Sequence, residues 1–404
     1  MSLLFPFPAL RPSPEVAGRV ASVPYDVVNA DEARALAEGN PLSFLHVSRA
    51  EIDLPAGTNP YADEVYARAA ENLAALRAAA PMIVESEPSL YVYRLHMGDH
   101  VQAGVAGCFS IDEYDADLIK KHEKTRPDKE DDRTKHMLTI GAQTGPVFLT
   151  YKASPAVDAI VARVMTGAPL YDLTAPDGVR HVVWRVPAGD TAALVASFGA
   201  LPCLYIADGH HRAASAARTR RALADRGAGE HDRVLAVAFP DDQMQILPYN
   251  RVVKDLGGRS PEAFLAELGA RMTVAEGGPA TPASHGQVAM YLAGTWYTLT
   301  LGAPPAGAGP DQVLDVSRLQ DEVLAPLLGI HDVRTDKRID FVGGIRGTGE
   351  LERLVDSGAW AVAFSHYPVS VDDLMRIADA GGIMPPKSTW FEPKLRDGLL
   401  SHLI

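Results

Sequence analysis

Residues 204–214 constrain the fold of this chain more than any other stretch of its sequence. The apolar run that ends at Ala207 predicts a buried strand, and the alanine-rich residues 213–224 predict a helix. Between them, Asp208 and Gly209 predict a tight turn, because glycine tolerates unusual backbone angles and lets a ligand approach the main chain. We therefore expect a strand that passes directly into a helix.

The residues at this junction are suited to binding an anion. A helix start offers unpaired N–H groups and the positive end of the helix dipole, and Arg212 can form two parallel bonds to phosphate oxygens. Asp208 stands where either a helix cap or a catalytic carboxylate would lie, and His210 and His211 are either acid–base groups or ordinary surface residues. The two histidines are not expected to share a metal, because neighbouring side chains on a helix diverge. The motif predicts phosphate handling and no metal site.

Residues 112–136 form a strongly charged block. One interpretation is a solvated helix or loop. The other is a lid that supplies ligands, because the block is long for an inert connection in a compact chain. As a lid it would offer Thr125, Lys129 and Arg133 to a phosphate and Glu123 as a carboxylate.

A second acidic candidate lies near the N-terminus. Residues 20–23 predict a short strand that ends at Pro24-Tyr25-Asp26. This turn either lines a pocket with Asp26 or is a plain connection before the next helix.

Length and patterning predict two domains. A chain of 404 residues exceeds the usual size of one domain, and the glycine-containing residues 255–260 suggest a joint. The first domain, 1–255, includes a predicted hairpin over 89–111, and the second, 256–404, ends in a β-α-β-α pattern over 339–380.

Charge and composition limit the partners. The net charge of −13 opposes nucleic-acid binding, which requires a basic face. Two cysteines argue against a disulfide framework, no apolar run is long enough for a membrane span, and the proline-broken N-terminus does not resemble a signal peptide. We expect a cytoplasmic protein with no membrane or nucleic-acid partner; a homodimer is compatible with the sequence.

Two glycine-rich segments remain as secondary candidates. Residues 344–349 follow a predicted strand and either seat a phosphate or form a common turn. Residues 382–389 are not a P-loop, because Pro386 replaces the second glycine and its neighbour Pro385 also lacks an N–H group. Lys387, Ser388 and Thr389 could still contribute to an anion site or a domain contact.

Three segments carry a resemblance to a known family: residues 204–212, the polar block 120–133 and residues 384–394 near the end. Together they resemble the DUF1015 family, essentially from residue 5 to about residue 400. The Asp-Gly-His-His-Arg motif of that family is similar to that of ParB/sulfiredoxin-like proteins, notably free serine kinases. The resemblance implies an α+β (mixed α/β) fold, in which a ParB/sulfiredoxin-like core carries the charged insertion 112–136 and a C-terminal α/β domain.

The same resemblance implies an activity. In free serine kinases the motif binds nucleotide phosphates, while a separate glutamate acts as the base that deprotonates the serine hydroxyl. This implies that residues 208–212 handle phosphate here, although the N-terminal pocket motif carries Asp26 rather than a glutamate. The expected substrate is serine or O-phosphoserine, and the expected cofactors are ATP or ADP with Mg²⁺.

Taken together, the sequence favours a phosphotransferase or phosphatase for a small hydroxylated metabolite. The helix dipole and Arg212 would hold the phosphoryl group, and Arg133 or Lys129 would close over it. One of Asp208, Asp26 or Glu123 would orient or deprotonate the hydroxyl, and His210 or His211 would act as acid or base. Two alternatives stay open: a ParB-like nucleotide-gated DNA-binding protein, for which no basic helix is found, and a nucleotide- or metabolite-binding protein without turnover. The donor and the direction of transfer stay open too.

Overall fold

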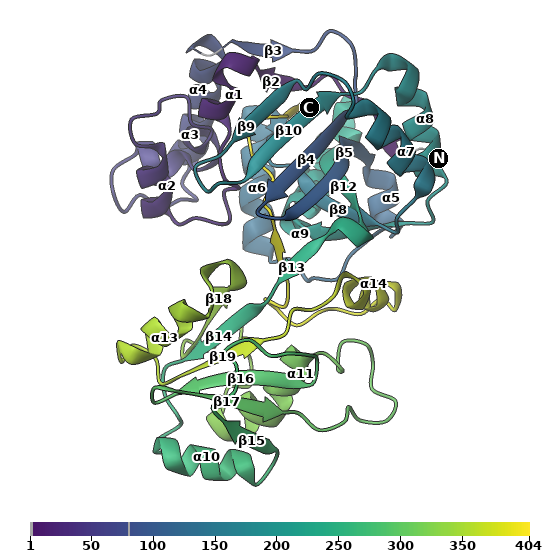
Figure 1. Cartoon of the computed structure of the whole chain (residues 1–404). Helices are drawn as coiled ribbons and strands as arrows, with labels where there is room; N and C mark the ends of the chain where they lie inside the picture. The colour runs from purple at the N-terminus through teal and green to yellow at the C-terminus, as the bar shows by residue number, and fades with distance from the viewer. Residues whose placement is uncertain (1–2, 80) are drawn as a thin grey trace. The chain divides into compact units, whose positions relative to one another are not determined.

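The computed structural model describes residues 3–79 and 81–404. The chain divides into two compact units, one formed by Met1–Met244 with Pro393–Ile404 and the other by Gln245–Glu392 (Figure 1). The division differs from the predicted joint at 255–260, because strand β14 (Tyr249–Val253) already belongs to the second sheet and the last dozen residues return to the first unit.

The first unit is built on a mixed sheet, in which nine strands pair within the described residues. Eight follow the order β6-β11-β8-β12-β5-β4-β10-β9, and β1 pairs with β5. The β11–β6 and β12–β8 pairs are parallel and the others are antiparallel. The strands are β1 (Leu4–Phe5), β4 (Tyr91–Met97), β5 (His100–Ser110), β6 (Ile119–Lys120), β8 (Val147–Tyr151), β9 (Tyr171–Thr174), β10 (Arg180–Arg185), β11 (Leu204–Asp208) and β12 (Arg233–Pro240).

Helices and short strand pairs complete the first unit. The short strands are β2 (Leu10–Pro12) with β3 (Met82–Val84), and β7 (Ala142–Gln143) with β21 (His402–Leu403). The helices are α1 (Pro14–Val20), α2 (Ala30–Ala37), α3 (Leu45–Ser48), α4 (Asp63–Ala79), α5 (Ile111–Asp115), α6 (Pro127–Ile140), α7 (Pro155–Val164), α8 (Ala188–Gly199) and α9 (His210–Ala222). Helix α6 packs against both α9 and α4.

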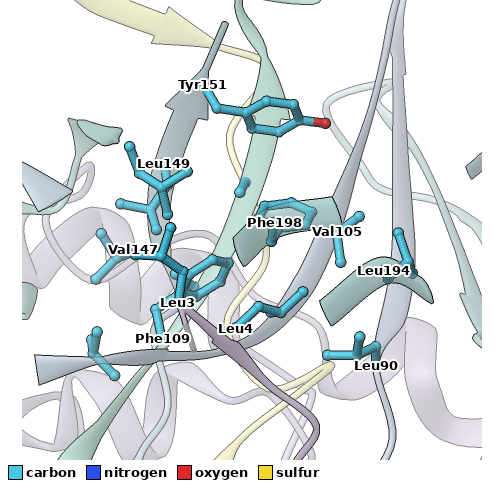
Figure 2. Close-up of a cluster of buried hydrophobic side chains, with 14 of the residues drawn as sticks. Leu3, Leu4, Leu90, Val105, Phe109, Val147, Leu149, Tyr151, Leu194 and Phe198 are labelled. Atoms are coloured by element: carbon cyan, nitrogen blue, oxygen red, sulfur yellow. The ribbon is translucent and has the colours of Figure 1, made fainter. Parts of the chain in front are cut away.

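The main core lies between the central strands and these helices. Strands β8 and β12 read as continuous apolar runs because they are central in the sheet and buried on both faces. Leu149 and Tyr151 of β8 meet Phe198 of α8 in the buried cluster of Figure 2. The core therefore holds β8, and β11 beside it, in fixed positions.

The second unit contains an antiparallel sheet whose described strands follow the order β15-β17-β16-β19-β14-β18. Its further strands are β15 (Thr273–Glu276), β16 (Gln287–Leu292), β17 (Thr295–Thr300), β18 (Ile339–Gly343) and β19 (Val362–His366), with β13 (Gln245–Leu247) and β20 (Trp390–Glu392) forming a separate pair. The helices are α10 (Pro261–Gly269), α11 (Asp315–Leu319), a π-helical turn (Gln320–Leu324), α12 (Ala325–Leu328), α13 (Thr348–Asp356) and α14 (Val371–Asp379).

Most predicted elements are confirmed, with three corrections. The hairpin is β4–β5, and the strand-turn-helix is β11–α9. The strand predicted over 20–23 is wrong: Val20 ends helix α1, and Ser22 makes only an isolated bridge to Asp397 from the far end of the chain. The elements of the β-α-β-α pattern are present, but β14 lies between β18 and β19. The charged block is not simply a solvated face, because Asp132, which it contributes to α6, is buried. The protein is thus a mixed α/β protein with a large mixed sheet and a second, antiparallel sheet.

Candidate functional site

The junction between β11 and α9 is a left-handed turn at Gly209, with φ of 96° and ψ of 30°. A side chain would be strained in this conformation, and a Cβ here would lie 3.0 Å from the guanidinium carbon of Arg212. The first helical main-chain bond runs from the Ala213 N–H to the Gly209 carbonyl at 3.0 Å. Within the described residues, the N–H groups of positions 210, 211 and 212 have no acceptor. Three amides at this helix start therefore lack an acceptor, as expected for the first turn of a helix.

Asp208 is the acidic residue at the end of β11. Its Oδ2 accepts a hydrogen bond from Lys394 Nζ at 3.0 Å and lies 3.6 Å from Arg212 Nη2. Burial raises the pKa of Asp208, but the opposing charges of Lys394 and Arg212 outweigh it and hold the pKa well below its ordinary value. Asp208 is therefore a carboxylate at neutral pH.

Arg212 is buried at the β11–α9 junction rather than exposed to solvent, since only 4% of the residue is accessible. Its Nη1 donates to the Pro146 carbonyl, and its Nη2 lies 3.8 Å from Asp26 Oδ2. Its Nε is buried without a hydrogen-bond partner. Burial alone lowers the pKa of Arg212, but the carboxylates of Asp26 and Asp208 raise it overall. Arg212 is thus a buried cation that joins three segments of the first unit.

His210 is a buried, neutral histidine. Its Nε2 accepts the His122 N–H at 3.4 Å, and its Nδ1 lies 3.6 Å from Glu123 Oε2. The rings of His122 and His210 meet edge to face, with centroids 4.4 Å apart. Burial and the neighbouring imidazole hold the pKa of His210 well below its ordinary value. The proton therefore belongs on Nδ1, on the side of Glu123.

His211 is less buried and bonds to the charged block. Its Nε2 accepts the Arg126 N–H at 3.1 Å, which ties the loop before α6 to the start of α9. Burial lowers the pKa of His211. Both histidines thus hold parts of the charged block against the junction.

A small cavity of about 20 Å³ lies beside Arg212. This volume has room for about one water molecule. The carboxyl of Asp397, which is 1% exposed, faces it, and its Oδ1 has no hydrogen-bond partner. Burial raises the pKa of Asp397 to about 7, against the opposing effect of Arg212. The lining residues are Tyr25, Ser48, Arg133, His136, Met137, Thr144, Gly145, Arg212 and Asp397.

The structure brings some of the predicted site residues together, whereas others bond to protein groups outside this cluster. Asp26, Asp208 and Arg212 share one cluster, and Glu123 reaches it through His210. Two residues of the charged block bond elsewhere: Lys129 to the Tyr61 hydroxyl at 2.8 Å and Thr125 to Glu130. Arg133 bonds to Asp132 at 2.8 Å, with its guanidinium 4.2 Å above the Tyr25 ring, and lines the small cavity together with Arg212.

Three residues of the site were not predicted. Lys394 and Asp397 come from the returning C-terminal segment, and His122 lies in the charged block. Lys394 ends the segment 384–394 that carries the family resemblance, but no local pattern indicates its pairing with Asp208 across 186 positions.

Neither a metal cluster nor a membrane helix is evident in the described part of the chain. Within residues 3–79 and 81–404, no group of three or more His, Cys, Asp or Glu side chains is placed to hold a metal ion. None of the helices in these ranges is both long and apolar enough to cross a membrane.

The comparison with solved structures finds only distant likenesses. A free serine kinase variant in complex with AMP is 13% identical, with a TM-score of 0.37 over 73% of this chain and 92% of the other. SbnI with a C-terminal truncation, from Staphylococcus aureus, is 15% identical, with a TM-score of 0.40 over 74% and 87%. A conserved hypothetical protein from Pyrococcus furiosus is 16% identical, with a TM-score of 0.35 over 74% and 95%.

The comparison with protein families is more specific. No curated protein matches the sequence. One family model, described as "Protein of unknown function (DUF1015)", matches residues 4–318, which include β11, Gly209, α9 and the charged block. This match covers more than three quarters of the chain, and the protein is therefore a member of the DUF1015 family.

Proposed function

We propose that the protein transfers a phosphoryl group to or from a small hydroxylated metabolite at the start of α9. The observation that carries the proposal is the set of three unpaired amides at positions 210–212, which directly follow Asp208 and Gly209 and include that of His210, the partner of Glu123. Phosphoryl transfer depends mainly on positioning and charge neutralisation, which these groups supply.

The amides of α9 would hold the transferred phosphoryl group. Arg212 contributes its positive charge from its buried position, while its contacts to Asp26 and Asp208 keep the two carboxylates in place. Lys394 adds a second positive charge 3.0 Å from Asp208. Arg212 therefore acts mainly on the arrangement of the site. Direct contact with a phosphate would use its unpartnered Nε or would require it to leave one of its present acceptors.

Glu123 is the carboxylate that we propose as the base. Its side chain is about half exposed, so a substrate hydroxyl can reach it, and it faces His210 Nδ1. In the forward direction the hydroxyl oxygen attacks the terminal phosphorus, its proton passes to Glu123, and the bond to the leaving nucleotide oxygen breaks. Asp26 and Asp208 are weaker candidates because Arg212 and, for Asp208, Lys394 compete for their oxygens.

Serine or O-phosphoserine is the substrate we propose, because the Asp-Gly-His-His-Arg motif at 208–212 resembles that of free serine kinases. The cofactor would be ATP or ADP, whose phosphates suit the three amides. Mg²⁺ would arrive with the nucleotide, since it needs only one or two protein carboxylates beside phosphate oxygens. The same proposal includes three further expectations from the sequence: a ParB/sulfiredoxin-like core, a cytoplasmic location and a homodimer.

The test is to incubate the full chain with serine plus ATP or ADP, and separately with O-phosphoserine, and to follow transfer by ³¹P NMR. Glu123→Gln should lower the rate roughly 10²–10⁴-fold with nucleotide binding retained, as expected for loss of a general base. The control is Glu71→Gln, which changes an exposed glutamate of α4.

A second candidate function is nucleotide binding without turnover. It is favoured by one observation, the bond between Lys394 and Asp208, which occupies one of the acidic groups. Calorimetric binding of ATP with no transfer over hours would support this alternative and overturn the catalytic proposal.

A further inference from the structure

The second unit contains a cavity of about 290 Å³ that the proposed phosphoryl transfer does not use. Its walls come from α11, the π-helical turn, the loop around residues 331–334 and the proline pair 385–386. The lining residues are Arg251, Val316, Gln320, His331, Asp332, Val333, Arg334, Pro385 and Pro386. The volume lies just below the range of about 300–1,000 Å³ for ligand pockets, so only a small ligand would fit.

Arg251 of β14 lines this cavity and is unusual among buried charges. Only 2% of the residue is exposed. Its guanidinium donates to two main-chain carbonyls, that of Tyr249 at 2.6 Å and that of Lys387 at 3.4 Å. Among the described residues no carboxylate lies within 4.0 Å of it, whereas buried arginines are ordinarily paired. Burial lowers the pKa of Arg251 to about 10, and the group remains a cation at neutral pH.

A second polar side chain in the lining of this cavity, Gln320, has an unpaired atom. Gln320 donates its amide N–H to the Ile330 carbonyl at 2.7 Å, but its Oε1 is buried with no hydrogen bond. Gln320 begins the π-helical turn, a feature often found at functional sites. Gln320 therefore adds an unsatisfied acceptor to the lining of the same cavity as Arg251.

The strand register places His366 on the same face of the sheet as Arg251. Arg251 pairs with Phe364, so His366 lies two residues further along the neighbouring strand on that face. Both ring nitrogens of His366 are buried without a hydrogen bond. Burial and the charge of Arg251 hold the pKa of His366 well below its ordinary value, so this histidine adds no charge. The buried positive charge on this face is that of Arg251.

Arg334 and Asp332 lie in the more exposed part of the lining. Arg334 forms two bonds of 3.0 Å to the Asp332 carboxylate, and these two charges balance each other. The remaining walls include Val316, Val333 and Pro385, which are apolar. The cavity thus combines a buried cation that has no carboxylate partner, only two carbonyls and the Phe341 ring 5.5 Å away, with a wall that is partly apolar.

We propose that this cavity binds a small organic anion whose carboxylate pairs with Arg251 and whose apolar part packs against Val316 and Val333. A carboxylate matches both the single positive charge and the fork geometry of the guanidinium. A phosphate ester shares this anionic chemistry and is the second source to test. The segment around Lys387 contributes through its carbonyl, which orients the guanidinium.

The experiment is isothermal titration calorimetry of the full chain in low-chloride buffer, with isobutyrate in one arm and inorganic phosphate in the other. Wild type should bind isobutyrate, and Arg251→Met should weaken this binding by roughly tenfold or more, because a charge-assisted hydrogen bond is lost. Arg353→Met is the control, since Arg353 is an exposed arginine of α13 bonded to Glu350. It should bind as wild type does.

A second variant keeps the test decisive if Arg251→Met does not fold. Val333→Trp leaves Arg251 in place but fills the cavity from a partly exposed loop. It should also weaken isobutyrate binding by tenfold or more. If only inorganic phosphate gives a binding signal, and Arg251→Met and Val333→Trp abolish that signal, the ligand is a phosphate rather than a carboxylate.

Absence of heat with both probes, or undiminished binding in Val333→Trp, would overturn the proposal. These results are separate from the ³¹P NMR test, because isobutyrate carries no phosphorus and the variants lie in the second unit. Either proposal can therefore fail alone.

Discussion

Arg212 in the first unit and Arg251 in the second are both almost fully buried, yet their surroundings are opposite. Arg212 has the carboxylates of Asp26 and Asp208 within 4 Å and faces a cavity with Asp397, and its pKa is raised. Arg251 has only carbonyl acceptors, and burial lowers its pKa to about 10. The comparison teaches that a buried guanidinium can either stabilise neighbouring carboxylates or, where it has no carboxylate partner, offer its charge to an anionic ligand. The second cavity is also much larger, about 290 Å³ against about 20 Å³.

The largest expected effect comes from Arg212→Met. Removing one partner of a buried ionic cluster leaves the others uncompensated, and the usual cost is about 3–5 kcal/mol of unfolding free energy. Urea unfolding followed by circular dichroism measures it, with Arg353→Met as an exposed control. A loss below about 1 kcal/mol would mean that Arg212 does not hold the carboxylates together.

The next effect concerns the pH dependence of stability. The pKa of Asp397 is raised to about 7 in the folded protein, against about 3.9 for an unperturbed aspartate. Between these values the folded state binds the proton more than the unfolded state does, so Asp397 lowers the free energy of unfolding as pH rises. The slope is up to about 1.4 kcal/mol per pH unit.

Asp397→Asn should remove the part of the pH dependence of stability that comes from Asp397. The measurement is the difference in unfolding free energy between wild type and variant, followed from pH 4 to pH 7. The difference is needed because His122, whose pKa is lowered to about 4, contributes with the opposite sign over much of this window. Asp99→Asn, in the exposed β4–β5 turn, should leave the slope unchanged. Equal slopes in wild type and Asp397→Asn would contradict the prediction.

A smaller effect is expected from Gly209→Ala. The left-handed backbone costs an alanine about 1–2 kcal/mol, and the new Cβ would also press on the Arg212 guanidinium. Gly141→Ala is a matched control, because Gly141 is also left-handed, with φ of 65° and ψ of 30°, and has nothing within 4 Å of its Cβ position. Thermal unfolding should show a larger loss for Gly209→Ala; equal losses would mean that the contact with Arg212 is unimportant.

The smallest effect is expected from Arg251→Met in the absence of ligand. Replacing a buried charge that has no carboxylate partner with an apolar side chain of similar length should change the unfolding free energy by less than about 1 kcal/mol, or increase it. Urea unfolding of this variant beside Arg212→Met tests the comparison directly. A loss as large as that of Arg212→Met would show that Arg251 supports the fold through its carbonyl contacts.

The sequence predicted the features that are local. The β11–Gly209–α9 junction and the β4–β5 hairpin depend on residues close together in the chain, so their patterns are visible without a structure. The partners of Asp208 were not predictable in the same way, because Lys394 reaches it across 186 positions.

The two arginines also looked different in the sequence for reasons unrelated to their burial. Arg212 stands in a distinctive motif, whereas Arg251 lies in Tyr-Asn-Arg-Val-Val, an ordinary alternating strand pattern. That Arg251 is buried without a carboxylate depends on how the β14–β19 pair and the turn at Lys387 meet around it. Such a property belongs to packing, and no short motif encodes it.

The return of residues 393–404 to the first unit has a consequence for how the protein is made. A ribosome that has just completed β20 has produced all of the second unit, while the nascent first unit still lacks Lys394 and Asp397. Until those residues emerge, Asp208 has Arg212 but no lysine beside it, and β7 has no β21 to pair with. The junction at Gly209 can therefore acquire its final neighbours only after the whole second unit has been synthesised.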